Sequence, residues 1–160
     1  MSLLTKHILI LSFIALLAVA CNQNVLVDRY HDIPENGWQY EHIVTDSFEI
    51  SEPGFYHLIS SNLRITGDYP YANIHLKVDV TSPDGKTIVH KVPVELAEKS
   101  GKWLGSGLGD IITFQTPIFH RKFLNQKGKY TFKITQNMRL ETLPSVVSAG
   151  IRVEQQEEIF

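Results

Sequence analysis

The sequence contains a single cysteine, Cys21, among its 160 residues. One cysteine cannot form a disulfide within the chain, and it cannot supply the several thiolates of a structural zinc site. The sequence also lacks a surplus of basic residues, since 15 lysines and arginines stand against 17 aspartates and glutamates, giving a net charge of -2. Because nucleic-acid binding depends on basic side chains that neutralise phosphates, this composition argues against a nucleic-acid partner.

Long apolar runs are missing except near the N-terminus, where residues 8–20 are apolar with one exception. This run is shorter than a bilayer span, which needs about 20 residues, and it follows the basic residue Lys6, as in a signal peptide. Small residues ending in Ala20 directly precede Cys21. The segment therefore resembles a bacterial lipobox, with Leu17 one position further out than the usual leucine.

The lipobox resemblance implies that residues 1–20 are a lipoprotein signal peptide, that cleavage falls between Ala20 and Cys21, and that Cys21 carries a covalent lipid. The alternative is ordinary secretion, which would leave Cys21 as a free thiol. One acyl chain gives reversible membrane binding, whereas two or more give stable anchoring. No aspartate follows the cysteine, so the common retention signal for the inner membrane is absent. We therefore expect a cell-envelope protein that is anchored in the outer membrane.

The rest of the chain lacks an amphipathic helix of useful length and shows short alternating segments that are typical of β-strands. In residues 73–81 every second residue is apolar, which predicts a strand with one buried face, and these residues are Ile74, Leu76, Val78 and Val80. The turn signal Ser82-Pro83-Asp84-Gly85-Lys86 leads into residues 87–96, so the two segments predict a hairpin. Further strands are expected at residues 25–30, 43–50, 55–65, 113–119, 129–135 and 150–154.

About eight short strands separated by turn signals predict an all-β fold, namely a single β-sandwich with jelly-roll-like connections. Pro93 and Pro117 cannot donate a ladder hydrogen bond, so both are expected on edge strands. We expect residues 21–36 to form the acylated N-terminus and a tether, and residues 37–160 to form the β-sandwich domain. Within the latter, residues 155–160 are expected to be an acidic tail.

The glycine-rich segment 101–110 is the main candidate for a functional loop, but it matches no catalytic motif. Trp103 stands where a phosphate-binding loop needs Ser or Thr, and Asp110 stands where a dinucleotide fingerprint needs its third glycine. The glycines directly beside Ser106 are too close for a nucleophile elbow. Two interpretations stay open: a structural loop with Trp103 packed beneath it, or a partner-binding loop formed by Trp103, Leu104, Gly105 and Gly107 together with Tyr69 and Tyr71.

Histidines and carboxylates form no recognisable catalytic or metal-binding pattern. His7 lies in the signal segment, and none of the six other histidines has metal-ligand spacing. His75 and His90 lie on the two arms of the predicted hairpin and could be cross-strand neighbours. No pair of acidic residues is singled out as a general acid and base. We therefore predict no catalytic residues, no metal site, no small-molecule substrate and no cofactor beyond the lipid on Cys21.

Five aromatic residues fall in or beside the predicted loops, and three interpretations apply to them. They can close the ends of the core, stack on sugar rings, or anchor a protein interface. The five are Trp38, Tyr40, Tyr69, Tyr71 and Trp103.

Several phrases follow Cys21 in a characteristic order. The most specific are Gly67-Asp68-Tyr69-Pro70-Tyr71 and Trp103-Leu104-Gly105-Ser106-Gly107. The others are Tyr30-His31-Asp32-Ile33-Pro34, Gly37-Trp38, Ser82-Pro83-Asp84-Gly85-Lys86, Gln136-Asn137-Met138-Arg139 and Gly150-Ile151-Arg152-Val153-Glu154. Together they resemble the gliding-motility lipoprotein family GldH of Bacteroidota.

The resemblance implies a non-enzymatic, lipid-anchored envelope protein. It also implies an accessory or scaffold role in the gliding motility and type IX secretion machinery, with partners among the envelope proteins of that apparatus. Cys21 alone carries over as a functional position. Two other hypotheses stay open: a surface lipoprotein that binds carbohydrate through loop aromatics, and an envelope hydrolase suggested only by scattered carboxylates and histidines.

Overall fold

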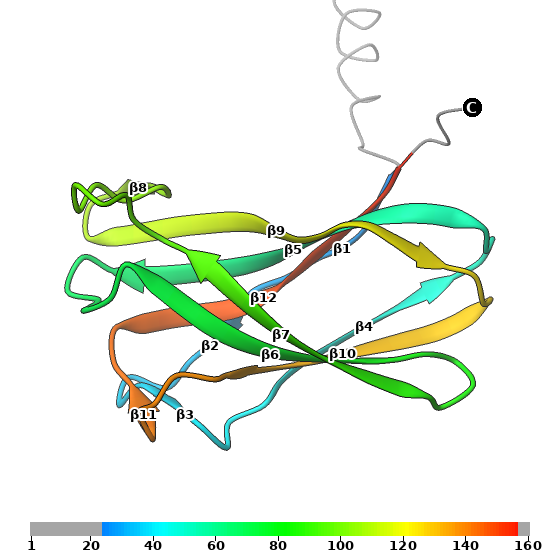
Figure 1. Cartoon of the computed structure of the whole chain (residues 1–160), viewed down its shortest axis with the longest axis horizontal. Helices are drawn as coiled ribbons and strands as arrows, with labels where there is room; N and C mark the ends of the chain where they lie inside the picture. The colour runs from blue at the N-terminus through cyan, green and yellow to red at the C-terminus, as the bar shows by residue number, and fades with distance from the viewer. Residues whose placement is uncertain (1–23, 157–160) are drawn as a thin grey trace, which may run out of the picture.

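The computed structural model describes residues 24–156, and every regular element in this range is a β-strand (Figure 1). The expected signal peptide with Ala20, the expected lipid site Cys21 and residues 157–160 lie outside the described residues. Residues 24–156 contain no helix with the length and hydropathy of a membrane span. In chain order the strands are β1 (Val25–Asp28), β2 (His31–Asp32), β3 (Trp38–Gln39), β4 (Val44–Ile50), β5 (Phe55–Thr66), β6 (Asn73–Thr81), β7 (Thr87–Glu95), β8 (Ser106–Leu108), β9 (Ile111–Leu124), β10 (Gly128–Gln136), β11 (Thr142–Leu143) and β12 (Val146–Gln155).

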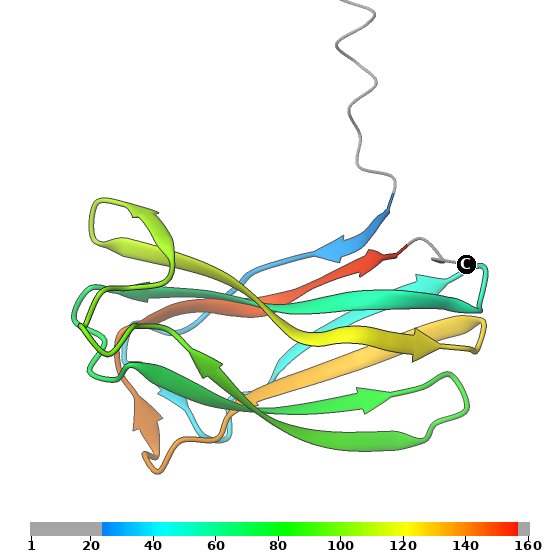
Figure 2. The ribbon, with the colours of Figure 1, turned by 45° about the horizontal axis from the view of Figure 1, so that its top comes forward.

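Two antiparallel sheets lie face to face, and Figure 2 shows them as two layers. One sheet has the strand order β1-β12-β5-β9-β8, with β2 also paired to β12, and the other has the order β4-β10-β6-β7. A short third pair joins β11 and β3. Apart from the hairpin β6–β7, successive long strands alternate between the two sheets, as in the double-sheet arrangement of a jelly roll. The predicted all-β sandwich is confirmed.

The hydrophobic core lies between the sheets and contains all four apolar residues predicted on one face of β6. Ile74, Leu76, Val78 and Val80 are each at most 3% exposed. They belong to one cluster with side chains of the opposite sheet, such as Ile59. Full burial of an aliphatic side chain of this size contributes about 1.5–3 kcal/mol relative to exposure. The predicted register of β6 is therefore confirmed.

Both prolines lie where a strand has a free edge among the described strands. Pro93 is on β7, the outermost strand of its sheet. Pro117 is on β9, whose second neighbour β8 pairs with residues 111–113 and does not reach the proline. The two edge predictions are confirmed. Because proline offers no backbone N–H, it also hinders the addition of a further strand at these edges.

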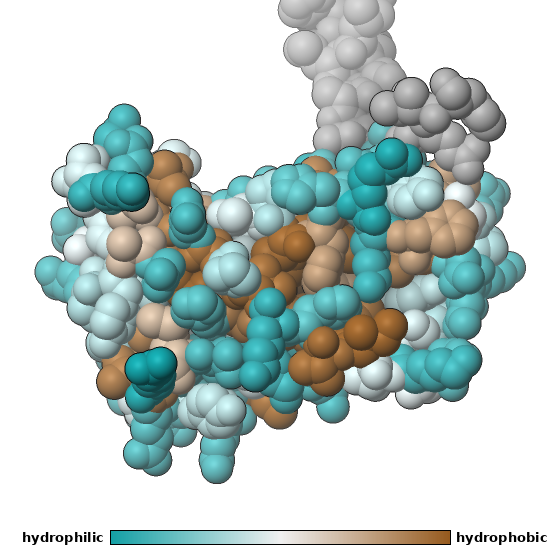
Figure 3. All heavy atoms as spheres, in the orientation of Figure 1, coloured by the Kyte–Doolittle hydropathy of each residue, from teal (hydrophilic) through white to brown (hydrophobic). Residues whose placement is uncertain are grey.

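The side of the sandwich between the edges β7 and β9 is apolar, and Figure 3 shows this surface in the orientation of Figure 1. Val92, Ile118 and Phe119 are partly buried there against the core. The ring of His90 packs on Phe119 with centroids 4.7 Å apart, and Nζ of Lys122 lies 3.4 Å from Nε2 of His90. These contacts join the two edges and partly cover the core on this side.

The N-terminal segment is part of the sheet, so the tether predicted for residues 21–36 is wrong from residue 25 onwards. β1 and β2 both pair with β12, and Val27 is buried in the core. The side chain of Asn62 donates to the carboxylate of Asp28 at 2.7 Å, and Arg152 forms an ion pair with the same carboxylate at 2.5 Å. The strand expected at residues 25–30 is thus confirmed as β1, whereas β2 has only two residues, too few to show an alternating pattern.

The two ends of the described chain lie side by side. The backbone N–H of Gln155 donates to the carbonyl of Asn24 at 2.7 Å, and that of Gln156 donates to the carbonyl of Tyr56 at 2.8 Å. Gln155, predicted as the first residue of an acidic tail, is instead the last residue of β12.

A buried carboxylate joins the two sheets on the side where β1 and β2 face β4. The side chain of Asp46, on β4, has no exposed surface, and its Oδ1 lies 2.8 Å from Nε2 of His31 on β2. Arg29, between β1 and β2, lies 3.7 Å from the same oxygen. Because a buried carboxylate without partners is strongly destabilising, His31 and Arg29 hold the N-terminal segment against the second sheet.

Two segments of the chain cross closely at Gly150 in β12. A Cβ atom at this position would overlap the carbonyl oxygen of Arg29. The side-chain amide of Asn62 donates to that same carbonyl at 3.1 Å, so the oxygen cannot move away without losing a buried hydrogen bond. Only glycine allows the segment between β1 and β2 to lie this close to β12.

Gly150→Ala is expected to destabilise the protein by about 1–3 kcal/mol, because the added methyl group forces the N-terminal segment off the sheet. Denaturant unfolding of the mature protein measures the change. Gly67→Ala is the matched control, because a Cβ there meets nothing within 4 Å, and it should change stability by less than about 0.5 kcal/mol. Equal unfolding midpoints for the two variants would contradict the close approach at Gly150.

His57 on β5 is fully buried between the sheets. Burial lowers the pKa of its imidazole below the ordinary value of 6.5, because a charged ring is poorly solvated there. Below pH 6.5 the unfolded chain therefore binds a proton at this residue that the folded chain does not bind. The folded state consequently loses stability as the pH falls through the unfolded value.

The free energy of unfolding should thus decrease on acidification from about pH 7 to about pH 5.5, with His57 contributing at most about 1.4 kcal/mol per pH unit. His57→Leu should make this dependence shallower, because leucine fills a similar volume and does not titrate. His120→Leu is the control, since His120 is exposed, and it should keep the wild-type slope. Denaturant titrations across this range measure the slopes, and an unchanged slope in His57→Leu would disprove the role of the buried imidazole.

Candidate functional site

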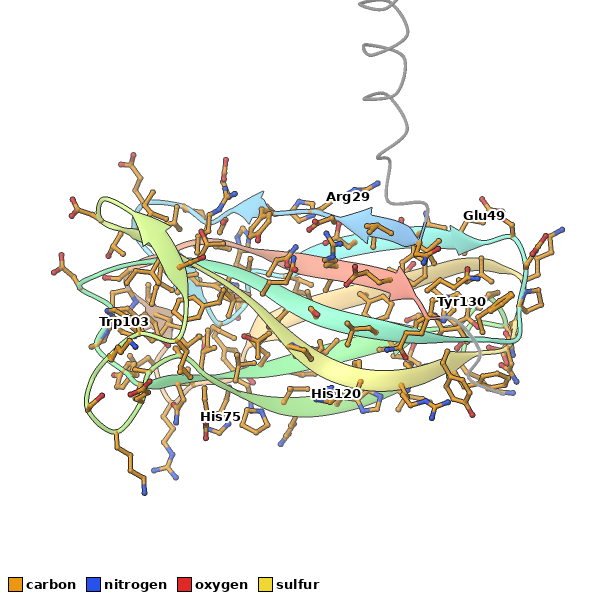
Figure 4. All side chains as sticks on the ribbon, turned by 90° about the horizontal axis from the view of Figure 1, so that it is seen from above. Arg29, Glu49, His75, Trp103, His120 and Tyr130 are labelled. Atoms are coloured by element: carbon orange, nitrogen blue, oxygen red, sulfur yellow. The ribbon has the colours of Figure 1, made fainter. Side chains whose placement is uncertain are left out.

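The loop residues singled out in the sequence lie at one end of the sandwich, which we call the loop end. It is formed by residues 67–72 between β5 and β6, residues 96–105 between β7 and β8, and residues 137–141 between β10 and β11. The opposite end, where β1 begins and β12 ends, is called the terminal end. In Figure 4 Trp103 marks the loop end, whereas Glu49 and Tyr130 lie towards the terminal end.

Tyr69 is a structural part of the loop end. Its side chain is 3% exposed, and its hydroxyl donates to the carbonyl of Asn73 at 3.1 Å. Burial raises the pKa of the Tyr69 phenol far above its ordinary value of 10.0, and the neighbouring Tyr71 adds to the increase. A buried, hydrogen-bonded ring of this kind cannot touch a partner directly. Tyr69 therefore supports the loops from inside. The sequence had suggested it as part of a partner-binding surface, and the structure does not place it there.

Trp103 is half-buried and links the glycine-rich loop to the core. The centroid of its ring lies 6.5 Å from that of Tyr69 and 6.4 Å from that of Phe114 on β9. An isolated bridge between Ala97 and Trp103 closes the loop behind the ring. These contacts favour the structural interpretation for Trp103, in which the loop is packed over its side chain.

The glycines of this segment have a packing role, whereas Leu104 faces solvent. A Cβ on Gly105 would lie 2.7 Å from the carbonyl oxygen of Thr113, and a Cβ on Gly107 would overlap the carbonyl oxygen of Ile111. Because glycine has no side chain at these two positions, the backbone of β8 can lie close enough to pair with β9. Leu104 is 53% exposed. Of the four predicted contact residues in this loop, Leu104 is the one most open to a partner.

Tyr71 borders a groove of about 500 Å³ at the loop end. Tyr71 is 36% exposed, and its ring packs edge-to-face on Tyr69 with centroids 5.9 Å apart. The groove therefore combines an accessible aromatic ring with amide, imidazole and guanidinium groups that can hydrogen-bond a polar ligand. Its lining residues are Tyr71, Asn73, His75, Asn137, Met138, Arg139 and Leu140.

Residues 137–140 line this groove but were not predicted as site residues, because their segment has neither strand nor helix periodicity. The buried side chain of Gln136 shapes it, since its Nε2 donates to the carbonyl of Leu140 at 2.9 Å and its Oε1 accepts from the N–H of Met138 at 2.8 Å. A second groove, of about 520 Å³, lies along the same segment beside Tyr40. The phrase Gln136-Asn137-Met138-Arg139, part of the family resemblance, was the one available signal.

The other two loop aromatics differ from each other. Trp38 is fully buried, and its Nε1 donates to the carbonyl of His42 at 2.9 Å. Tyr40 is 50% exposed. Closing the end of the core is therefore the role of Trp38 and Tyr69, whereas Tyr40 and Tyr71 present their rings at the surface.

His75 and His90, which could have been cross-strand neighbours, are not paired with each other. His75 is opposite Pro93, and His90 is opposite Val78. Because side chains alternate along a strand and residues 75 and 78 are an odd number apart, the two histidines face opposite sides of the sheet. Residues 24–156 contain no group of three or more potential metal ligands.

His31 and Asp46 form an Asp–His pair of the kind used in catalysis, but their surroundings are structural. The only side-chain partner recorded for His31 among the described residues is Asp46 itself. A catalytic pair needs a nucleophile within hydrogen-bond reach of the histidine. The contact instead joins β2 to β4 across the sandwich.

Comparisons with known proteins point to one family. A family model described as GldH lipoprotein matches residues 25–153. The gliding motility lipoprotein GldH of Flavobacterium johnsoniae is 26% identical over 155 residues, which cover 92% of this chain and 96% of the relative. A GldH homolog of Christiangramia forsetii is 25% identical over 157 residues, which cover 94% and 96%. The matched range starts at the first residue of β1 and ends within β12, so it includes both sheets and the loop end.

Proposed function

The chain belongs to the GldH lipoprotein family, and from this premise we propose that it is an accessory or scaffold component of the gliding motility and type IX secretion machinery. The observation that carries the proposal is the family match, which extends over residues 25–153 and thus over the whole described sandwich. The proposed role is non-enzymatic: the protein holds partner proteins at the envelope and performs no reaction on them.

We further propose that Cys21 carries the lipid, and that the lipid anchors the protein in the outer membrane. Two observations support this proposal: the lipobox resemblance of the residues before Cys21, and the lipoprotein description of the family. Several acyl chains give an anchor that does not exchange readily. Replacement of Cys21 by alanine should release the protein from the membrane without unfolding it.

The proposed surface for a protein partner is the loop end around Leu104. A leucine that is 53% exposed on a loop supported by Trp103 gives an apolar contact on a rigid base. A few residues contribute most of the affinity at protein interfaces, and tyrosine is enriched among them. The exposed rings of Tyr71 and Tyr40 lie at the same end and enlarge the apolar surface.

Leu104→Asp should reduce the recovery of gliding or type IX secretion subunits at least about tenfold in cross-linked affinity purification from native envelopes, because a charge at a desolvated contact is unfavourable. Val89→Asp is the matched control, since Val89 is 54% exposed but lies on β7 away from the loop end. Loss of gliding or type IX cargo secretion in Leu104→Asp cells should accompany the loss of partners.

The outcome that would overturn the proposal is a gene deletion that leaves both spreading and type IX secretion unchanged. Equal partner recovery with Leu104→Asp and with wild type would overturn only the choice of surface. These two outcomes separate the function from the place at which the partner binds.

A second candidate function is carbohydrate binding, and the groove beside Tyr71 is the observation that favours it. An accessible aromatic ring can stack on a sugar, while Asn73 and Arg139 in the same groove can hydrogen-bond its hydroxyl groups. Binding on a glycan array should fall at least about tenfold in Tyr71→Ala and stay unchanged in the control Tyr40→Ala, whose ring borders the other groove. An array without any bound glycan would exclude this candidate.

A further inference from the structure

We propose that the terminal end of the sandwich lies on the headgroup layer of the membrane through a patch formed by Tyr56, Phe123 and Arg121. The inference rests on the proposed lipid anchor at Cys21 and adds a second, non-covalent membrane contact to it. This contact fixes the orientation of the domain, so that the loop end points away from the bilayer.

The short length of chain between Cys21 and the sheet limits the distance between the domain and the membrane. Val25 is the first residue of β1, and four Cα–Cα steps separate it from Cys21. An extended chain spans at most about 3.3–3.6 Å per residue, so these four steps reach about 14 Å. The lipid is therefore attached within reach of the first turns and strand ends of the sandwich.

Phe123 lies in the same row of the sheet as the first described residues. The N–H of Gln155 donates to the carbonyl of Asn24, which places β12 beside β1 at this row. Gln155 is opposite His57 on β5, and the neighbouring residue Tyr56 is opposite Phe123 on β9. Adjacent strands are about 4.8 Å apart, so three strand steps place Phe123 about 14 Å from Asn24 across the sheet.

The three side chains form one surface patch, in which Arg121 and Phe123 are exposed and Tyr56 is half-buried. Phe123 is 49% exposed, and its ring centroid lies 5.2 Å from that of Tyr56. The guanidinium of Arg121 lies over the same tyrosine ring, 4.2 Å from its centroid. Arg121 and Phe123 are two residues apart on β9 and therefore project from the same face of the sheet.

The positive charge of Arg121 within the patch favours an anionic surface, and the exposed acid Glu52 lies between β4 and β5 at the same end. The acids on the neighbouring strands β1 and β12 are already occupied, because Asp28 and Glu154 both form ion pairs with Arg152. Lys127, exposed in the turn after β9, adds positive charge at the same end. The acid Glu49 lies on β4, which packs near β1 rather than near β9.

Exposed aromatic rings beside an arginine are the side chains that favour the interface between water and lipid. The rings lie at the level of the headgroups, and the cation is attracted to lipid phosphates.

This orientation gives the loop end a defined distance from the membrane. β5 runs from the terminal end to the loop end over 12 residues, which corresponds to about 40 Å at the rise of a β-strand. Leu104 and Tyr71 are then presented at the far end of the domain, accessible to proteins that do not touch the bilayer.

The test uses the mature acylated protein reconstituted into phosphatidylcholine vesicles that contain phosphatidylglycerol. Because the sulfur of Cys21 is occupied by lipid, Phe123→Cys and Leu104→Cys each introduce the one free thiol for a fluorescent label. The two positions are matched, with exposed fractions of 49% and 53%. A lipid-borne quencher should quench the label at residue 123 severalfold more than the label at residue 104, and equal quenching would overturn the proposal.

A charge reversal tests the chemistry of the patch. With the label on Lys127→Cys in the neighbouring turn, the additional change Arg121→Glu should lower quenching severalfold, whereas Lys99→Glu in the loop after β7 should not. Unchanged quenching in Arg121→Glu would overturn the role of the patch. A label at residue 123 that is protected from aqueous reagents but not quenched by lipid would show a covering protein instead of a bilayer.

Mass spectrometry of the purified protein distinguishes a failure of the proposed lipid anchor from a failure of the proposed orientation. A chain without lipid on Cys21 would overturn the anchoring proposal, and the orientation would fall with it. A chain that is acylated and inserted, but quenched equally at residues 123 and 104, would overturn the orientation alone.

Discussion

The pairing of β12 with β1 and β2 on one side and with β5 on the other is the interaction on which the rest of the structure depends. β12 is the last of the described strands, yet it lies inside its sheet, and its residues Ala149, Ile151 and Val153 are buried in the core. The close crossing at Gly150 and the hydrogen bond from the buried Asn62 to Asp28 hold the N-terminal segment in place. Because this ladder joins the first strand to the last, the fold is complete only when both termini are present.

The pairing of β12 with β1 and β5 also means that the two ends of the molecule are held by different contacts. The ladder places Asn24 and Gln155 together, so the proposed lipid attachment and the patch around Phe123 share the terminal end. The loops at the other end are free of this constraint. They are held by their own contacts, such as the packing of Trp103 on Phe114 and the hydrogen bonds of Gln136. A sandwich with strands as long as β5 separates these two ends by most of the length of the domain.

The long strands were predictable, because a sheet with one buried face imposes a period of two on the sequence. The hairpin β6–β7, the burial of Ile74 to Val80 and the edge positions of Pro93 and Pro117 follow from local pattern and from proline chemistry. β1 lies within the strand expected at residues 25–30, whereas the two-residue strand β2 was not predictable, since its partner β12 lies more than a hundred residues away. The placement of His75 and His90 on opposite faces depends on the exact register of the hairpin, which a one-residue offset reverses.

The sequence by itself determined the class of fold and the family, because strand periodicity and the short family phrases each depend on residues that are neighbours in the chain. Only the tertiary structure decided which aromatic residues are buried and which are accessible. Tyr69 and Tyr71 are two residues apart, but the packing of distant segments buries the first and exposes the second. The groove beside Tyr71 and the patch of Tyr56 with Phe123 have the same origin, since each joins side chains from strands or loops that only the paired sheets bring together.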